Sequence, residues 1–213
     1  MTISAVTAAP GEKPPVLWHY GETELDPIST KTLGFWLYML SDALIFAGLF
    51  AAYGVMDQPM NAAGGPTAAQ VAHPIAAMWQ TIAVLSSVLS YSLATVAIRH
   101  GNRNGLMLGI IGALVFSAIF LGLEYHDFAS LFAVGATPDR SGYLSVFFML
   151  VGTHSLHMMF GMLWMLVLLV QIQRFGLTTD VVTRLLNLRL FWQFQASVWV
   201  CVYVFVYLAG AIQ

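Results

Sequence analysis

Five long apolar runs are the feature that most limits what this chain can fold into. Each run holds about 20 residues or more, the length that an α-helix needs to cross about 30 Å of hydrocarbon. Apolar and polar residues do not alternate in these runs, so the strands of a membrane β-barrel are excluded. The sequence therefore predicts an all-α fold, a polytopic membrane protein with a bundle of five transmembrane helices. The expected helices cover about residues 32–56, 74–98, 105–125, 142–171 and 190–212.

The composition agrees with a membrane protein and excludes several other classes. Charged residues make up 8% of the 213 residues, against about 25% in a soluble domain. The net charge of −2 excludes nucleic-acid binding through a basic surface. The one cysteine, Cys201, excludes an intramolecular disulfide and a cysteine-based metal site. No internal repeat is found, which argues against a transporter built from inverted repeats.

The basic residues predict the orientation of the chain. Residues 1–31 are polar and contain no long apolar run, so we expect a cytoplasmic tail in front of a transmembrane domain at 32–213. Seven of the eight basic residues fall in this tail and in the second and fourth loops, and only Arg140 falls on the other side. Since basic residues favour the cytoplasmic side, we expect the amino terminus in the cytoplasm and the carboxyl terminus in the periplasm.

Four ionisable residues lie inside the predicted helices and are the first candidates for a site. Asp42 falls near the middle of the first helix and is interpreted either as a proton-relay group or as a neutral, hydrogen-bonded packing anchor. Glu124 falls near the outer end of the third helix. It is interpreted either as an interfacial acid that ends the helix or as a group with an ion-pair or proton-exit role. His154 and His157 share one face of the fourth helix, and a direct or water-bridged contact between Asp42 and His154 is expected.

These residues favour a buried polar cluster over a cofactor site. A bis-histidine haem needs two histidines at matching depth on different helices, and the other four histidines lie in the tail, the loops or the interfaces. A metal site with two histidines and one carboxylate is conceivable but less favoured. We therefore expect no catalytic residue, no haem and no metal in this chain.

Several short motifs, in order along the chain, resemble subunit III of the haem–copper terminal oxidases. The similarity is greatest to the five-helix subunit of the cytochrome o (bo-type) ubiquinol oxidases, and it extends from about residue 32 to the carboxyl end. The matching stretches are Gly-Phe-Trp-Leu-Tyr at 34–38 with Ser41 and Asp42, Gly-Leu-Glu-Tyr at 122–125, Pro-Asp-Arg-Ser-Gly-Tyr-Leu-Ser at 138–145, Val-Gly-Thr-His-Ser-Leu-His at 151–157, and Phe191 and Trp192 with Val-Trp-Val-Cys-Val at 198–202.

The resemblance implies an accessory subunit of a proton-pumping quinol oxidase in the bacterial inner membrane. In that family, haem and copper belong to subunit I, and subunits I, II and IV are the expected partners. The family's buried carboxylate corresponds to Asp42, its second acid to Glu124, and its paired histidines to His154 and His157. Subunit III of a cytochrome c or menaquinol oxidase is the main alternative, and a small membrane transporter is a more distant one.

The resemblance also implies bound phospholipid and support of proton uptake. We expect a V-shaped cleft between a group formed by the first two helices and a group formed by the other three. Basic residues on the cytoplasmic side are candidates to bind the phosphates, although setting the orientation of the chain is an equally good explanation of them. The candidates are Lys31, Arg99, Arg174, Arg184 and Arg189.

One stretch departs from the family pattern. Where the family reads Trp-His-Phe-x-Asp-x-x-Trp, this chain has Gln193 in place of the histidine and Ala196 in place of the acid. Both replacements are neutral, so a titrating role for this stretch is not expected. The fold prediction does not change.

Overall fold

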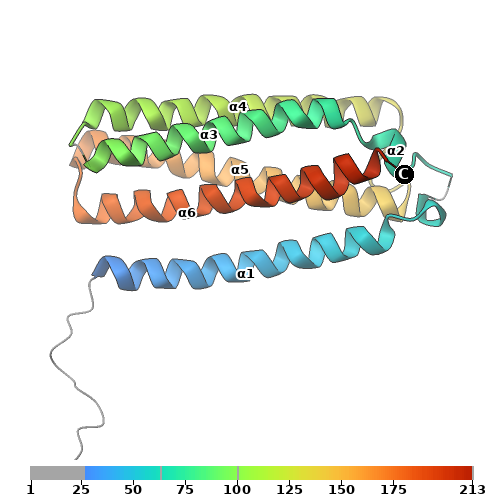
Figure 1. Cartoon of the computed structure of the whole chain (residues 1–213), viewed down its shortest axis with the longest axis horizontal. Helices are drawn as coiled ribbons and strands as arrows, with labels where there is room; N and C mark the ends of the chain where they lie inside the picture. Colours follow the sequence, from blue (N-terminus) through green and yellow to red (C-terminus); the bar gives the residue numbers. More distant parts are fainter. Residues whose placement is uncertain (1–26, 63, 100, 213) are drawn as a thin grey trace, which may run out of the picture.

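A computed structural model describes residues 27–62, 64–99 and 101–212. The predicted cytoplasmic tail lies outside these residues except for its last five positions, which begin the first helix. No strand occurs among the described residues, and five helices are long and apolar enough to cross a membrane. The predicted fold class is therefore confirmed (Figure 1). The elements are α1 Pro27–Met56, η1 Pro59–Ala62, α2 Ala68–Val71, α3 Pro74–Arg99, α4 Arg103–Ala133, α5 Gly142–Phe175, α6 Thr179–Val202 and the π-helical turn η2 Tyr203–Leu208.

Two helices differ most from their expected bounds, by about eight residues or more at one end. α4 continues to Ala133 rather than to residue 125, because Asp127 faces the interior and finds partners there. α6 begins at Thr179 rather than at residue 190, and the Thr178 hydroxyl accepts a hydrogen bond from the Val181 amide at its start. The long basic loop expected before the last helix is therefore mostly helix.

Small residues hold α3 and α4 together most closely. Gly109 of α4 lies against Ala94 of α3, where an added Cβ would stand 2.6 Å from the Ala94 Cβ. The Ser90 hydroxyl donates to the Gly109 carbonyl over 2.9 Å. Close approach through small residues and interhelical hydrogen bonds is how membrane helices associate in the absence of a hydrophobic driving force.

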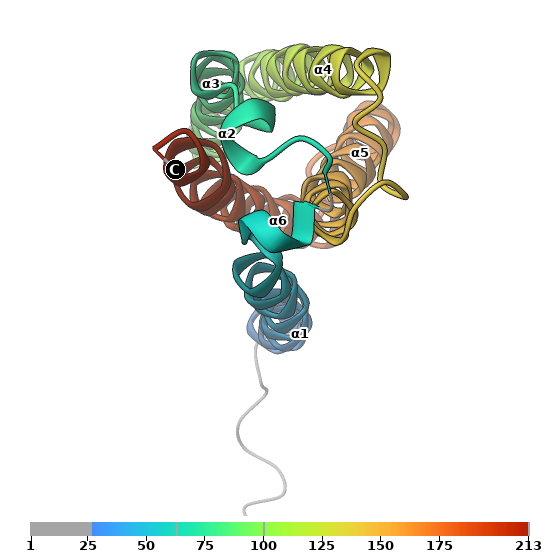
Figure 2. The same cartoon turned by 90° about the vertical axis from the view of Figure 1, so that its right-hand side faces the viewer.

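The arrangement of α1 differs from the expected two-group cleft. α3, α4, α5 and α6 form the bundle, and α1 lies outside it against α5 and α6 (Figure 2). The first two spanning helices are therefore not a packed pair. The segment that carries η1 and α2 is long enough to cross the end of the bundle, and this allows α3 to begin on the far side of α6 (Figure 2).

Candidate functional site

One central turn of α5 sends polar side chains toward three neighbouring helices. His154 reaches α6, where its Nε2 lies 3.1 Å from the Gln195 carbonyl oxygen. Ser155 reaches α4, where its hydroxyl donates to the Glu124 carboxyl group. His157 reaches α1, where its Nε2 lies 3.0 Å from Asp42 Oδ1. Because consecutive residues are about 100° apart on a helix, one turn can serve three partners.

The contact between Asp42 and His157 contains a single shared proton. His157 Nδ1 lies 2.7 Å from the Thr153 carbonyl oxygen, and because a carbonyl only accepts, Nδ1 carries a hydrogen. The bond between Nε2 and the carboxyl oxygen then needs one more proton, on either group. The pair is therefore a neutral acid beside a neutral imidazole, or a carboxylate beside an imidazolium. In both forms it has no net charge.

A glutamine completes this contact from α6. Gln195 Nε2 donates to the second oxygen of Asp42 over 3.3 Å. Asp42 is 3% exposed, whereas the His157 side chain retains 19% of its surface. The histidine is therefore the more exposed member of the pair.

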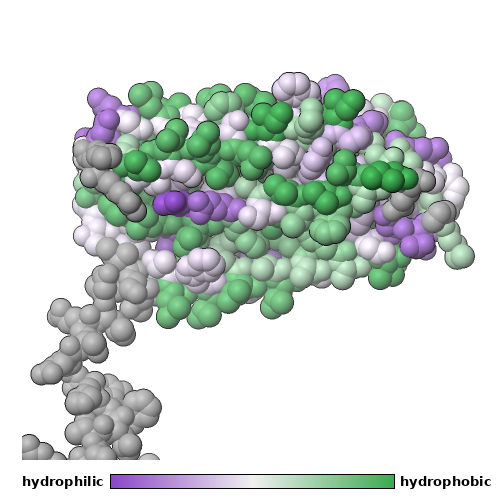
Figure 3. Space-filling view, in the orientation of Figure 1, coloured by the Kyte–Doolittle hydropathy of each residue, from purple (hydrophilic) through white to green (hydrophobic). Residues whose placement is uncertain are grey.

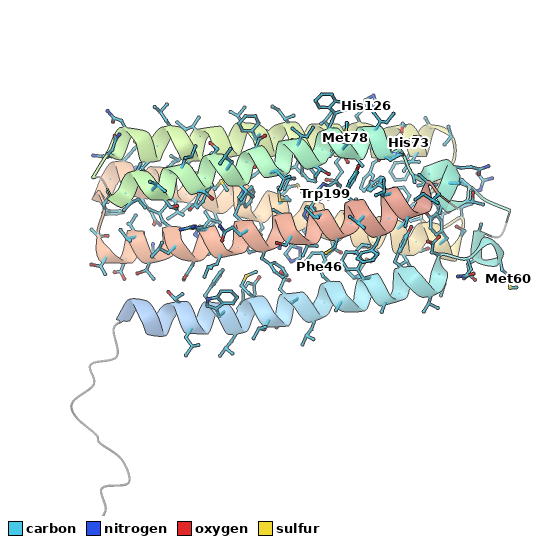
Figure 4. The ribbon with its side chains drawn as sticks, in the orientation of Figure 1. Phe46, Met60, His73, Met78, His126 and Trp199 are labelled. Carbon is cyan, nitrogen blue, oxygen red and sulfur yellow. The ribbon has the colours of Figure 1, made fainter. Side chains whose placement is uncertain are left out.

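The structure does not contain the expected contact between Asp42 and His154. His154 is fully buried against the rings of Phe120 and Trp199, with centroid distances of 5.6 and 5.1 Å. His154 and His157 are three residues apart, so their side chains differ in direction by about 60° around the helix. His154 therefore points toward α6, and His157 faces α1. Figure 4 shows Trp199 inside the bundle and Phe46 at the junction of α1 with it.

Glu124 lies deeper than its predicted position at a helix end. It is 2% exposed and stands about 14 Å from the end of α4, from the helical rise per residue. One turn further along α4, Asp127 accepts from the Tyr207 hydroxyl over 3.5 Å and lies 3.5 Å from His73 Nδ1. The His73 side chain is half exposed at the start of α3 (Figure 4). The sequence analysis missed Asp127, although its spacing of three residues from Glu124 would have placed both acids on one face of a longer helix.

Arg174 and Arg184 lie at one end of the bundle, whereas Arg189 lies about 15 Å from the start of α6. Arg174 is exposed at the end of α5, and Arg184 donates to Gln171 Oε1 over 2.9 Å. Arg189 is half-buried, one turn before Gln193. The side chains of Lys31 and Arg99 lie outside the described residues. Arg103, which was not a candidate, donates to the Ile172 carbonyl over 2.8 Å and so covers the end of α5.

The two departures from the family pattern have different surroundings. Ala196 is buried, and Gln193 is half-buried on the outer side of α6. The neighbouring Gln195, rather than either of them, supplies the polar contact to Asp42. Among the described residues, no three His, Cys, Asp or Glu side chains converge in a way that could hold a metal ion.

Four apolar helices in a bundle, a fifth packed against α5 and α6, and acid–histidine contacts between these helices define an integral membrane subunit or carrier. The comparisons decide between these classes. A sequence model of the family described as cytochrome c oxidase subunit III matches residues 23–211, so the chain belongs to that family. The predicted resemblance is confirmed.

Curated relatives match most of the chain. Cytochrome bo(3) ubiquinol oxidase subunit 3 of Pseudomonas aeruginosa is 40% identical over 88% of this chain and 88% of the relative. The protein of the same name from Pseudomonas putida is 38% identical over 84% of this chain and 86% of the relative. A probable quinol oxidase subunit 3 from Staphylococcus aureus is 32% identical over 84% of this chain and 89% of the relative.

Proposed function

We propose that this chain is the accessory subunit III of a proton-pumping terminal oxidase that oxidises ubiquinol and reduces oxygen in the bacterial inner membrane. The observation that carries the proposal is the similarity to cytochrome bo(3) ubiquinol oxidase subunit 3 along most of both chains. In this function the chain supplies no catalytic residue. Haem and copper belong to a partner subunit I, which this chain stabilises, and subunits II and IV are further partners.

A role in support of proton uptake rests on the pair formed by Asp42 and His157. The pair exchanges one proton between an acid and an imidazole without changing its net charge, which lowers the cost of holding ionisable groups inside a membrane. The partly exposed His157 is the side through which the pair meets its surroundings. In this proposal the pair passes a proton between the acid and the imidazole beside the catalytic subunit and carries no step of oxygen reduction.

A role in lipid binding rests on the basic end of the bundle. Arg174 and Arg184 lie where the end of α5 meets the start of α6. Guanidinium groups at this level pair well with lipid phosphates. We assign this end, together with Lys31, Arg99 and Arg189, to the cytoplasmic face, which places the amino terminus in the cytoplasm.

Affinity purification of the tagged chain from native membranes tests the proposal. We expect it to bring with it subunits that show haem absorption and that consume oxygen with ubiquinol but not with reduced cytochrome c. The chain expressed alone should have no Soret band. Recovery without any haem-containing subunit, or a Soret band from the isolated chain, would overturn the proposal, and turnover with cytochrome c would move it to the other donor class.

A further inference from the structure

Two buried side chains on facing helices carry polar atoms without a hydrogen-bond partner among the described residues. They are the Gln80 amide, whose oxygen and nitrogen are both unpartnered, and the Glu124 carboxyl group, whose Oε2 is unpartnered. Ser87 of α3 bonds to Ser117 of α4 over 2.8 Å. Gln80 lies seven residues before Ser87, and Glu124 lies seven residues after Ser117. Because seven residues are about two helical turns and the two helices run in opposite directions, Gln80 and Glu124 share one level on facing sides.

These unpartnered atoms indicate an internal water molecule. Buried polar groups nearly always have a partner, and an ordered water molecule supplies it where no protein group does. The Gln80 amide offers a donor and an acceptor, and Glu124 Oε2 offers an acceptor or a hydrogen according to its protonation. One water molecule between them therefore has the partners that it needs in either case.

The other oxygen of Glu124 also suits both protonation states. The Ser155 hydroxyl contacts Glu124 Oε1 and lies 2.9 Å from the Val151 carbonyl oxygen, and it has only one hydrogen. When Glu124 is a carboxylate, the hydroxyl donates to it. When Glu124 is protonated, the acid donates to the hydroxyl, which then donates to the Val151 carbonyl. Glu124 can thus gain or lose a proton without any movement of the surrounding groups.

A line of titratable groups leads from Glu124 to the end of the bundle where α3 begins. Asp127 lies one turn away on the same face of α4, and its Oδ1 lies 3.5 Å from His73 Nδ1. The His73 side chain keeps 51% of its surface exposed. Tyr207 donates to the other oxygen of Asp127, and the exposed His126 is its neighbour in the sequence. Figure 3 shows hydrophilic residues at this end, beyond a surface that is largely hydrophobic.

We propose that Glu124 is a proton-binding site that exchanges with the water at this end of the bundle through Asp127 and His73. The His73 ring takes a proton from the water on one nitrogen and gives the hydrogen on Nδ1 to Asp127. Asp127 passes a proton to Glu124 by way of the water molecule that Gln80 holds, and the reverse steps release it. Like charges one turn apart repel in a membrane interior, so the two acids keep at least one proton between them.

This site is separate from the pair formed by Asp42 and His157. Ser155 faces α4, whereas His157 faces α1, and the two sites share no residue. The inference goes beyond the proposed function, which assigns proton uptake to that pair. The site opens at the end of the bundle opposite the one that carries Arg174 and Arg184.

Infrared spectroscopy of the purified complex tests whether Glu124 binds an exchangeable proton. A protonated carboxyl group has its own C=O stretching band, which shifts when deuterium replaces the proton. We expect a band that Glu124→Gln abolishes and that shifts after transfer to deuterium oxide. The inference would be overturned if no band depends on Glu124 at any pH at which the complex stays folded, or if the Glu124 band does not exchange.

Replacement of His73 tests the route. His73→Gln keeps a polar side chain but cannot carry the proton, so exchange at Glu124 should slow by about tenfold or more, because a positioned acid–base group contributes about 10²–10⁴-fold to proton transfer. Asp127→Asn should slow it likewise. His126→Gln is the matched control, since His126 neighbours Asp127 but lies on the outer side of α4 (Figure 4), and its exchange rate should equal that of the parent.

Equal exchange rates in the His73→Gln and His126→Gln variants would overturn the route. Haem content and oxygen consumption of the same preparations report on the proposed function separately. A complex without haem would therefore refute that function and leave the Glu124 measurement valid, whereas an active complex with a silent Glu124 would refute only this inference.

Discussion

Replacement of Asp42 separates packing from proton exchange. Asp42→Leu removes the partner of His157 Nε2 and of Gln195 Nε2, whose bonds to the carboxyl group measure 3.0 and 3.3 Å. Interhelical hydrogen bonds in membrane proteins contribute about 0.6 kcal/mol on average and about 1.7 kcal/mol at most. The loss of two such bonds should therefore destabilise the subunit by about 1–3 kcal/mol.

Asp42→Asn should leave the packing almost intact. Its carbonyl oxygen can accept from Gln195 Nε2, and its amide can donate to the His157 nitrogen that faces it, because the other ring nitrogen already carries the hydrogen. The cost should stay below about 1 kcal/mol. The variant can no longer exchange a proton with His157, so a role in proton uptake would appear as slower oxygen consumption by a complex of normal stability.

The assay combines thermal denaturation of the purified complex with oxygen consumption. Ser41→Ala is the matched control, because Ser41 neighbours Asp42 and, among the described residues, its exposed hydroxyl bonds only to the carbonyl of Tyr38 on its own helix. The control should behave like the parent protein. If Asp42→Leu assembles, melts and turns over like the parent, then Asp42 is neither a packing anchor nor a functional group, and the interpretation of the site is wrong.

Three further changes test other contacts. Gly109→Leu should lower the yield of folded protein, because its Cβ would clash with Ala94 and overpacking costs about 1–3 kcal/mol. Gly122→Leu on the same helix is the control and should fold, since a Cβ there meets no atom within 4 Å. Size-exclusion profiles of fluorescent fusions compare the two variants. Arg103→Ala removes the donor to the last carbonyls of α5 and should lower the melting temperature by the equivalent of about 1 kcal/mol. Trp192→Phe deletes the indole bond to Ser87 and should cost about 1 kcal/mol in the same melting assay.

The sequence predicted the spanning helices well because hydropathy over about 20 residues is a local property. The start of α6 was missed, although Val181, Leu185 and Leu188 repeat on its buried face while the polar Arg184 faces outward. This is the apolar spacing of an amphipathic helix. The stretch 174–189 was instead interpreted as a loop because Arg174, Arg184 and Arg189 make it basic.

Burial of the candidate residues was easier to predict than their contacts. Asp42, Glu124 and His154 are buried and His157 is partly exposed, yet which acid meets which histidine depends on where α1 and α4 pack around α5. Those positions are set by contacts between residues far apart in the sequence, which spacing along one helix does not reveal. Asp127 was missed for a different reason, because the predicted helix ended at about residue 125, before this acid.

The attachment of α1 explains why an acid is placed inside the membrane at all. Lipid tails are as apolar as the helix surfaces, so apolar contact alone sets neither the rotation nor the depth of a helix against its neighbours. α1 packs only against one side of the bundle, and Asp42 forms side-chain hydrogen bonds from it to both neighbouring helices. That residue meets one partner on α5 and one on α6, which fixes both rotation and depth at a single point. The carboxyl group therefore determines the rotation and depth of α1 against the bundle. The proton that it shares with His157 leaves the pair without net charge, which a membrane interior tolerates.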